Sequence, residues 1–177
     1  MPSKEILRKK FSYIRKNKYF EVEQSFFSPI IKLIKKKNIR KIALYYPSNF
    51  EVSTLKLFEI LNNKKSLSTY LPALSNGYMK FVKWKLLQPL KVNNFGFLDP
   101  ASSKAQCYPD LIITPLLAYD NSKNRLGYGK GYYDKYFRKN KNIVKIGIAF
   151  SFQKFDKINT SKFDIKLDYI LTEKGMF

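Results

Sequence analysis

The residues best suited to chemistry gather in one segment, RLGYGKGYYD, which runs from Arg125 to Asp134. It contains three alternating glycines, Gly127, Gly129 and Gly131. Glycine permits positive φ and the close approach of a ligand, so successive backbone N–H groups can converge on a phosphate beside the start of a helix. Arg125 and Lys130 add positive charge, and Asp134 could hold a magnesium ion that bridges phosphates. The segment therefore predicts a phosphate-binding loop.

The spacing of these glycines differs from that of a Walker A loop and from that of the dinucleotide-binding fingerprint. A tight turn between a strand and a helix is the alternative interpretation, in which the glycines serve only the backbone. The combination of three alternating glycines with an arginine, a lysine and an aspartate favours the phosphate-binding loop.

Composition excludes several kinds of active site. The chain has 177 residues, no histidine and one cysteine, Cys107. Without histidine there can be no Ser-His-Asp triad, no Cys-His pair and no histidine-ligated zinc, so any metal must be a hard ion held by oxygen. One cysteine allows no intrachain disulfide, which suits a reducing compartment. Because no apolar run is long enough for a signal peptide or a membrane span, we expect a cytoplasmic protein.

The formal net charge is +21, from 34 lysines and arginines against 13 aspartates and glutamates. Such a charge attracts any anion, including nucleotides and nucleic acid, and does not choose among them. A protein that binds RNA or another polyanion is therefore an alternative interpretation of the chain. The lysines are scattered over the whole length without one clear block, which is typical of a solvated surface. We expect no specific nucleic-acid partner.

Strands that alternate with helices must position the loop. Ser3 can cap a helix that begins at Lys4, where apolar residues recur at helical spacing. The other helices are expected over residues 19–37, from 53 or 54 to 61, and near 132–139. Strands are expected over residues 41–46, 67–71, 78–84, 111–114, 144–150 and 169–171, and residues 86–108 look irregular. This order predicts one Rossmann-like α/β domain over residues 1–177, with three α/β/α layers and a mostly parallel sheet.

The loop segment and the preceding ITPLLAYD resemble the signature of the 5-formyltetrahydrofolate cyclo-ligases, also called methenyltetrahydrofolate synthetases. This signature is long and specific, and the resemblance extends over nearly the whole chain. The other stretches that match the family are KEILR, FEVST, LPALSNGYMKFVKW, NNFGFLDP, KIGIAFSFQ and FDIKLDYILTE.

The resemblance implies which residues would bind ATP. Lys4 and Arg8 are one helical turn apart and would grip the phosphates. The loop would cradle the triphosphate along its length, through Arg125, Leu126, Gly127, Tyr128, Gly129, Lys130, Gly131, Tyr132 and Tyr133. Lys130 and Arg125 would act as catalytic residues that stabilise charge on the phosphoryl group. The predicted Mg²⁺ ligands are Asp134 and Asp168.

The resemblance also implies a folate pocket beside the ATP site. Glu51 would accept hydrogen bonds from the pterin ring, and Tyr46 would line the same pocket. Four further side chains are candidates for its walls: Met79, Phe81, Trp84 and Phe97. Part of the loop would touch folate as well, through Tyr128, Gly129, Lys130, Gly131 and Tyr132. The loop would therefore lie between the two substrates.

The reaction that the resemblance implies is the ATP- and Mg²⁺-dependent cyclisation of 5-formyltetrahydrofolate to 5,10-methenyltetrahydrofolate, with release of ADP and phosphate. The γ-phosphoryl group would pass to the formyl oxygen, and N10 would then attack the formyl carbon as phosphate leaves. The protein would mainly position the reactants and stabilise charge. A relative with the same fold and nucleotide loop but another substrate remains an alternative. The expected partners are the folate and ATP, with no membrane, and the expected state is a monomer.

Overall fold

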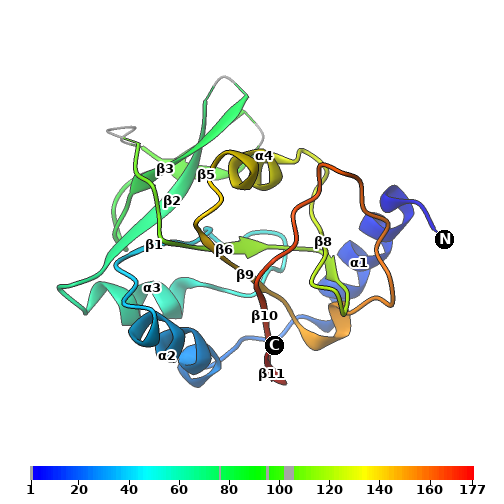
Figure 1. The fold of residues 1–177 in the computed structure, drawn as a ribbon, viewed down its shortest axis with the longest axis horizontal. Coiled ribbons are helices and arrows are strands. Elements are labelled where there is room, and N and C mark those ends of the chain that lie inside the picture. The colour runs from blue at the N-terminus through cyan, green and yellow to red at the C-terminus, as the bar shows by residue number, and fades with distance from the viewer. Residues whose placement is uncertain (1, 76, 95, 102–105) are drawn as a thin grey trace.

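A central sheet of seven strands organises the computed structural model, which describes residues 2–75, 77–94, 96–101 and 106–177. The strand order is β11-β10-β9-β6-β1-β2-β3 (Figure 1). The strands are β1 (Lys41–Ala43), β2 (Ser68–Ser75), β3 (Tyr78–Lys83), β6 (Leu111–Pro115), β9 (Val144–Ile148), β10 (Tyr169–Thr172) and β11 (Gly175–Met176). From β10 to β2 all neighbours are parallel, and the edge strands β3 and β11 are antiparallel to theirs. The predicted mostly parallel sheet is confirmed.

Helices cover both faces of this sheet, as Figure 1 shows. On one face lie α2 (Ser28–Lys36) and α3 (Leu55–Asn62), and on the other lies α4 (Tyr132–Lys139). The helix α1 (Lys4–Lys18) packs beside the short strand β7 (Ala118–Tyr119). Two 3₁₀ turns, η1 (Gln24–Phe27) and η2 (Ser151–Gln153), complete the helical elements of the described residues. The expected three-layer α/β/α architecture is therefore confirmed.

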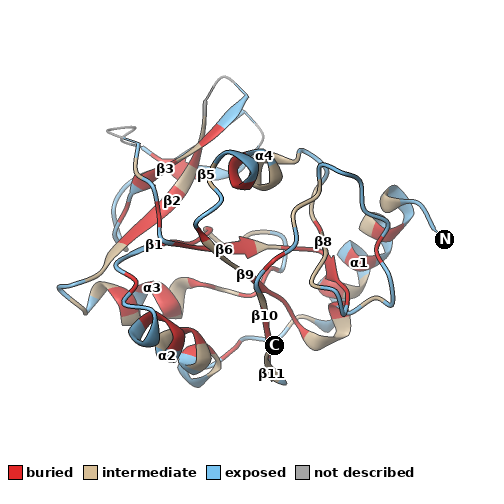
Figure 2. Ribbon diagram, in the orientation of Figure 1, coloured by how far each residue is buried: buried red, intermediate tan, exposed pale blue. Residues whose placement is uncertain are grey.

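Alternate side chains of the parallel strands enter different cores, because successive residues of a strand point to opposite faces. Ile42 and Ile113 pack with the α2 and α3 side chains, whereas Ala43 and Ile112 pack with the α4 side chains. The central strand β6 is buried from Leu111 to Thr114 (Figure 2). A separate cluster joins the apolar face of α1 to the β7 region, and there Leu7 is 2% exposed.

The expected helix over residues 19–37 is shorter in the structure. Tyr19 already has extended backbone, with ψ 139°, where α1 ends. The helix α2 begins at Ser28, with Pro29 in its first turn. Proline lacks an N–H and its ring clashes with the carbonyl four residues earlier, so a helix starts at this residue type more readily than it runs through it.

The strand β2 runs through Pro72, where the sequence predicts its end. The neighbouring strand β1 pairs with β2 only as far as Tyr70. Beyond Tyr70, β2 pairs with β3. Pro72 is therefore tolerated although it lacks an N–H, because the part of β2 that pairs with β1 ends before it. Farther along the same side, the Leu74 N–H donates to Asp99 Oδ2 at 3.0 Å.

Residues 86–108 are less irregular than expected, because they contain a short hairpin. Its strands are β4 (Leu90–Val92) and β5 (Leu98–Pro100), which pair antiparallel. The Asn93 side chain closes the hairpin by donating to Asp99 at 2.9 Å and accepting from the Phe97 N–H at 3.1 Å. Three-residue strands give too short an alternation to be recognised in a sequence.

Candidate active site

A cavity of about 530 Å³ lies at the carboxyl ends of the parallel strands. Tyr46 follows β1, Pro115 ends β6, and both line it. Ligands of open α/β sheets bind in this position, outside the carboxyl ends of the strands. Its size lies within the range of roughly 300–1,000 Å³ that is typical of small-molecule sites.

The glycine-rich loop forms one wall of the cavity, and every residue from Arg125 to Asp134 contributes to it. The loop leaves a hairpin made by β7 and β8 (Arg125–Leu126), which Asp120 closes by accepting the backbone N–H groups of Ser122 and Asn124. At its other end Gly131, with φ +65°, begins α4. The predicted loop is therefore present between a hairpin strand and a helix, and a left-handed glycine begins the helix.

Gly129 is the position in this loop where a side chain fits worst. Its φ of +99° is rarely adopted by other residues, and a Cβ there would lie 3.2 Å from Arg8 Cζ. The guanidinium of Arg8 therefore lies directly over the loop backbone. By contrast, a Cβ on Gly127 would meet nothing within 4 Å.

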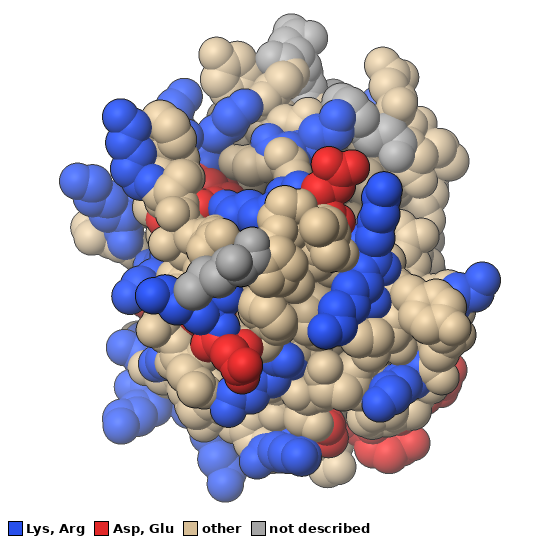
Figure 3. Space-filling view, turned by 90° about the vertical axis from the view of Figure 1, so that its right-hand side faces the viewer, with Lys and Arg blue, Asp and Glu red and all other residues tan. Residues whose placement is uncertain are grey.

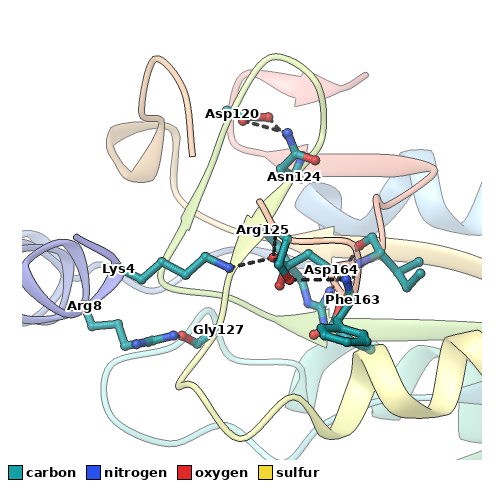
Figure 4. A network of polar contacts seen from close by, with 11 residues as sticks. Lys4, Arg8, Asp120, Asn124, Arg125, Gly127, Phe163 and Asp164 are labelled. Atoms are coloured by element: carbon teal, nitrogen blue, oxygen red, sulfur yellow. Dashed lines mark hydrogen bonds and ion pairs between the residues drawn. The ribbon is translucent and has the colours of Figure 1, made fainter. Parts of the chain in front are cut away.

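The helix α1 supplies cations to the cavity wall beside the glycine loop. Lys4 Nζ contacts Asp164 Oδ2 at 2.6 Å, and Arg8 Nε donates to the Gly127 carbonyl at 2.9 Å (Figure 4). Burial of Asp164 opposes its ionisation, but hydrogen bonds from Lys4 and Ser161 outweigh that effect and lower the pKa of the carboxyl. Lys4 and Arg8 thus line the same cavity as the glycine loop.

Arg125 and Asp134 form a nearly buried pair in the cavity wall. The two terminal nitrogens of Arg125, Nη1 and Nη2, donate to the two carboxylate oxygens of Asp134 at 3.0 and 2.9 Å. The Arg125 side chain is 6% exposed. The Ile165 N–H donates to the same carboxylate at 3.0 Å. The arginine therefore fixes the aspartate in place, and the chain that follows Asp164 lies against it.

The structure does not bring Asp168, a predicted metal ligand, to the cavity. Asp168 precedes β10, at the opposite edge of the sheet from the carboxyl ends, and its carboxylate binds the Lys145 N–H at 2.7 Å and Nζ at 3.0 Å. Asp164, in the same FDIKLD stretch, lines the cavity instead. In the described part of the chain no group of three or more Asp, Glu, Cys or His side chains could hold a metal by itself.

Glu51 also lines the cavity and is 6% exposed. Tyr128 Oη donates to Glu51 Oε1 at 2.6 Å, and the Ser48 N–H donates to Oε2 at 2.9 Å. Burial raises the pKa of Glu51, while the Tyr128 hydrogen bond, the charge of Arg15 and the Ser48 hydrogen bonds act against this rise. Burial likewise raises the pKa of Tyr128, which keeps its hydroxyl protonated as a donor.

The predicted pocket walls are only partly placed at the cavity. Met79 and Phe97 line it, but Trp84 and Phe81 do not. Trp84 is 2% exposed and packs on Phe58 in the core under α3, with ring centroids 5.0 Å apart. Phe81 is fully buried in the opposite core. Lining residues that sequence reasoning missed include Pro72, Leu74, Asn93, Leu98, Asp99 and Asp164.

Basic side chains are spread over the one face of the molecule that Figure 3 shows. On the face turned toward the viewer in Figure 3, Lys and Arg side chains lie over the whole area and not in one block. Within the described residues, no helix combines the length and the hydropathy that crossing a membrane requires.

Known proteins resemble this chain along nearly its full length. The sequence profile of the 5-formyltetrahydrofolate cyclo-ligase family matches residues 3–173. The 5-formyltetrahydrofolate cyclo-ligase of Haemophilus influenzae is 33% identical over 162 residues, which cover 85% of each chain. The enzyme of that name from Mycoplasma genitalium is 32% identical over 141 residues, covering 78% of this chain and 76% of the relative.

Solved structures agree with the sequence comparison. The 5,10-methenyltetrahydrofolate synthetase of Aquifex aeolicus matches with a TM-score of 0.78 and 32% identity, covering 98% of this chain and 91% of that one. The 5,10-methenyltetrahydrofolate synthetase of Mycoplasma pneumoniae matches with a TM-score of 0.71 and 27% identity, covering 96% and 98%. The chain therefore belongs to the 5-formyltetrahydrofolate cyclo-ligase family.

Proposed function

We propose that this protein converts 5-formyltetrahydrofolate to 5,10-methenyltetrahydrofolate, with ATP and Mg²⁺ as its co-substrate and metal. The observation that carries the proposal is a single cavity that is lined by the glycine loop, by two α1 cations and by the buried Glu51. The loop and the cations suit phosphates and make the phosphate end of the proposed site, and Glu51 suits the N–H groups of a pterin ring and makes its folate end. Membership of the family supports the same reaction.

The phosphate end has donors of several kinds for ATP. Backbone N–H groups of the loop, together with Lys4 and Arg8, would bind the triphosphate, because convergent amides and cations favour phosphate. Lys130 lines the cavity and is the candidate for stabilising charge on the transferred phosphoryl group. Arg125 already holds Asp134 with both of its terminal nitrogens, so it would act by positioning that carboxylate.

The carboxylates at this end fit magnesium. Mg²⁺ is commonly bound through one or two carboxylates together with substrate phosphates and water. Asp134 and Asp164 both line the cavity and are held by Arg125 and Lys4, so they would bind the ion. When bound, the ion would neutralise charge on the phosphates. This assignment replaces Asp168 by Asp164.

The remaining residues would orient the folate. Glu51 would accept hydrogen bonds from the pterin, and Tyr46, Met79 and Phe97 would pack against its rings. Direct transfer of the phosphoryl group to the formyl oxygen needs no protein nucleophile, which suits a chain without histidine. We also propose that residues 1–177 act as one domain, in a cytoplasmic monomer, consistent with a single cysteine.

Purified protein should form the methenyl chromophore from 5-formyltetrahydrofolate only when both ATP and Mg²⁺ are present. Absorbance of the product measures turnover directly, and ADP release should match it mole for mole. An excess of chelator should abolish the signal, and added Mg²⁺ should restore it. Full activity in excess chelator would refute the metal assignment, and ATP hydrolysis without product would point to another substrate.

Glu51→Gln should weaken folate binding more than ATP binding. A carboxylate that accepts pterin N–H groups makes charge-assisted hydrogen bonds, each worth roughly 1.5–3 kcal/mol. Calorimetric titration with each ligand separately measures the two losses. The matched control is Glu59→Gln, which changes an exposed glutamate on α3 and should alter neither affinity. Equal losses for both ligands would mean that Glu51 only supports the fold.

A further inference from the structure

Arg15 is a buried cation that sequence reasoning did not assign to the site. It lies on α1, and its spacing from Lys4 and Arg8 places all three on one stripe of the helix. Unlike them it does not line the cavity, and it is 1% exposed. Arg15 is therefore a buried positive charge behind the wall of the cavity.

The Arg15 guanidinium contacts the back of the folate end. Nη2 donates to Tyr128 Oη at 2.7 Å and to the Asn49 carbonyl at 2.6 Å, and Nη1 donates to the Leu116 carbonyl at 3.2 Å. Tyr128 Oη in turn lies 2.6 Å from Glu51 Oε1. A continuous chain of hydrogen bonds therefore runs from Arg15 through Tyr128 to Glu51.

The chemistry of the donors fixes the direction of this chain. A guanidinium can only donate, so the Tyr128 oxygen must accept from Arg15. The single hydroxyl proton of Tyr128 is then left for Glu51, which must accept it at Oε1. Glu51 Oε2 already accepts from the Ser48 N–H. In this arrangement Glu51 accepts hydrogen bonds at both oxygens, and acceptance of hydrogen bonds is the role that pterin N–H groups require.

Burial of Arg15 has a cost that packing alone does not explain. Its Nε is buried and has no hydrogen-bond partner among the described residues. An unpaired buried donor on a charged group lowers stability, and taking a charge out of water is itself costly. A cost of this kind at a position beside the site is typical of functional residues.

We propose that Arg15 is a positioning residue, which acts through Tyr128 to keep the Glu51 carboxylate ionised and aimed as an acceptor at the folate. The inference rests on the proposed function, because it takes Glu51 to be the folate contact. It adds that the same helix serves both substrates, through Lys4 and Arg8 at the phosphates and Arg15 at the pterin.

The groups around Glu51 explain why its ionisation would depend on Arg15. The groups that face it are Arg15 from α1, Tyr128 from the loop, Tyr133 from α4, and Tyr45 and Ser48 from the chain after β1. Burial raises the pKa of Glu51, and Arg15 is the cation among the groups that act against this rise. Without Arg15 the carboxyl should bind a proton more readily as the pH falls, and a neutral acid is a poorer acceptor.

Arg15→Met tests the proposal through the pH dependence of the folate KM. We expect the KM to rise roughly tenfold, the effect of one lost charge-assisted hydrogen bond, and to rise further at pH 6 than at pH 8, while the ATP KM changes little. Arg15→Lys keeps the charge and should restore a profile close to that of the parent. Arg40→Met removes an exposed arginine and serves as the matched control.

Two results would overturn the proposal. One is a loss of folate affinity in Arg15→Met that is equal at pH 6 and pH 8. The other is a loss of the same size when Glu51→Gln is already present, because an effect that acts through Glu51 must vanish in that background. If Arg15→Met does not fold, Tyr128→Phe interrupts the same chain of hydrogen bonds. It should raise the folate KM, and more so at pH 6 than at pH 8. A rise in the folate KM that does not depend on pH overturns the proposal.

Carbon-13 NMR of the Glu51 carboxyl gives a readout that needs no substrate. In the ligand-free protein the titration midpoint of Glu51 should lie higher in Arg15→Met than in the parent. An unchanged midpoint overturns the inference even if the enzyme turns over folate. Conversely, a shifted midpoint in a protein without turnover upholds the inference and contradicts the proposed function.

Discussion

Gly129→Val should abolish turnover while most of the fold is retained. The backbone of Gly129, with φ +99°, disfavours a β-branched residue, and a Cβ would lie 3.2 Å from Arg8 Cζ and 3.3 Å from Nη2. The valine would therefore displace Arg8 and occupy the space over the loop where phosphate must approach. Each lost donor to the transferred phosphoryl group would cost about 2.7–4 kcal/mol, or roughly 10²–10³ in kcat, by analogy with oxyanion donors. Methenyl formation and calorimetric ATP binding measure the loss.

The matched control for this variant is Gly175→Val. Gly175 also has positive φ, +121°, but a Cβ there would meet nothing within 4 Å, and the residue does not line the cavity. Because the backbone strain is similar, Gly175→Val should lower the melting temperature about as much as Gly129→Val does. Its kcat should stay close to that of the parent. If Gly129→Val stays folded and turns over at the parent rate, the glycine loop does not hold the phosphates.

Asp164→Asn should raise the Mg²⁺ concentration needed for half-maximal activity, and Asp168→Asn should not. Loss of even a supporting group costs a metal site about 10–100-fold in affinity or activity, so loss of a ligand should cost at least that much. Asp168 pairs with Lys145 outside the cavity, and its carboxylate side chain is 42% exposed. Its replacement should therefore cost only about 0–1 kcal/mol of stability.

Titration of the initial rate against Mg²⁺ compares the two variants, with thermal unfolding as the check on the fold. Equal Mg²⁺ requirements for Asp164→Asn and the parent would remove Asp164 from the site. A raised requirement in Asp168→Asn alone would reinstate the assignment that sequence reasoning favours.

Sequence patterns predicted the features that depend on local residues. The glycine loop, the start of α1 at Lys4 and the layered α/β fold each follow from spacing and residue type over short stretches. The buried strand over residues 111–114 was recognisable for the same reason, since an unbroken apolar run is typical of a strand covered on both faces.

Features that depend on tertiary contacts were not predictable in this way. Arg15 looks like any surface cation in a lysine-rich helix, and only the docking of α1 buries it. FDIKLD contains two aspartates, and which one meets the loop depends on where β10 begins. Trp84 was a plausible pocket wall by its type, but it follows β3 and packs on Phe58 in the core under α3.

The placement of α1 has a consequence for how the enzyme is made. Arg8 and Arg15 find their partners Gly127 and Tyr128 at sequence separations of 119 and 113 residues, and Lys4 finds Asp164 at 160. At about 5–20 residues per second, the first helix is synthesised roughly 6–30 seconds before those partners. Contacts so distant in sequence form late, because the loops that they close are long. A growing or truncated chain would therefore hold no working site, and catalysis would begin only after the last third of the protein has been synthesised.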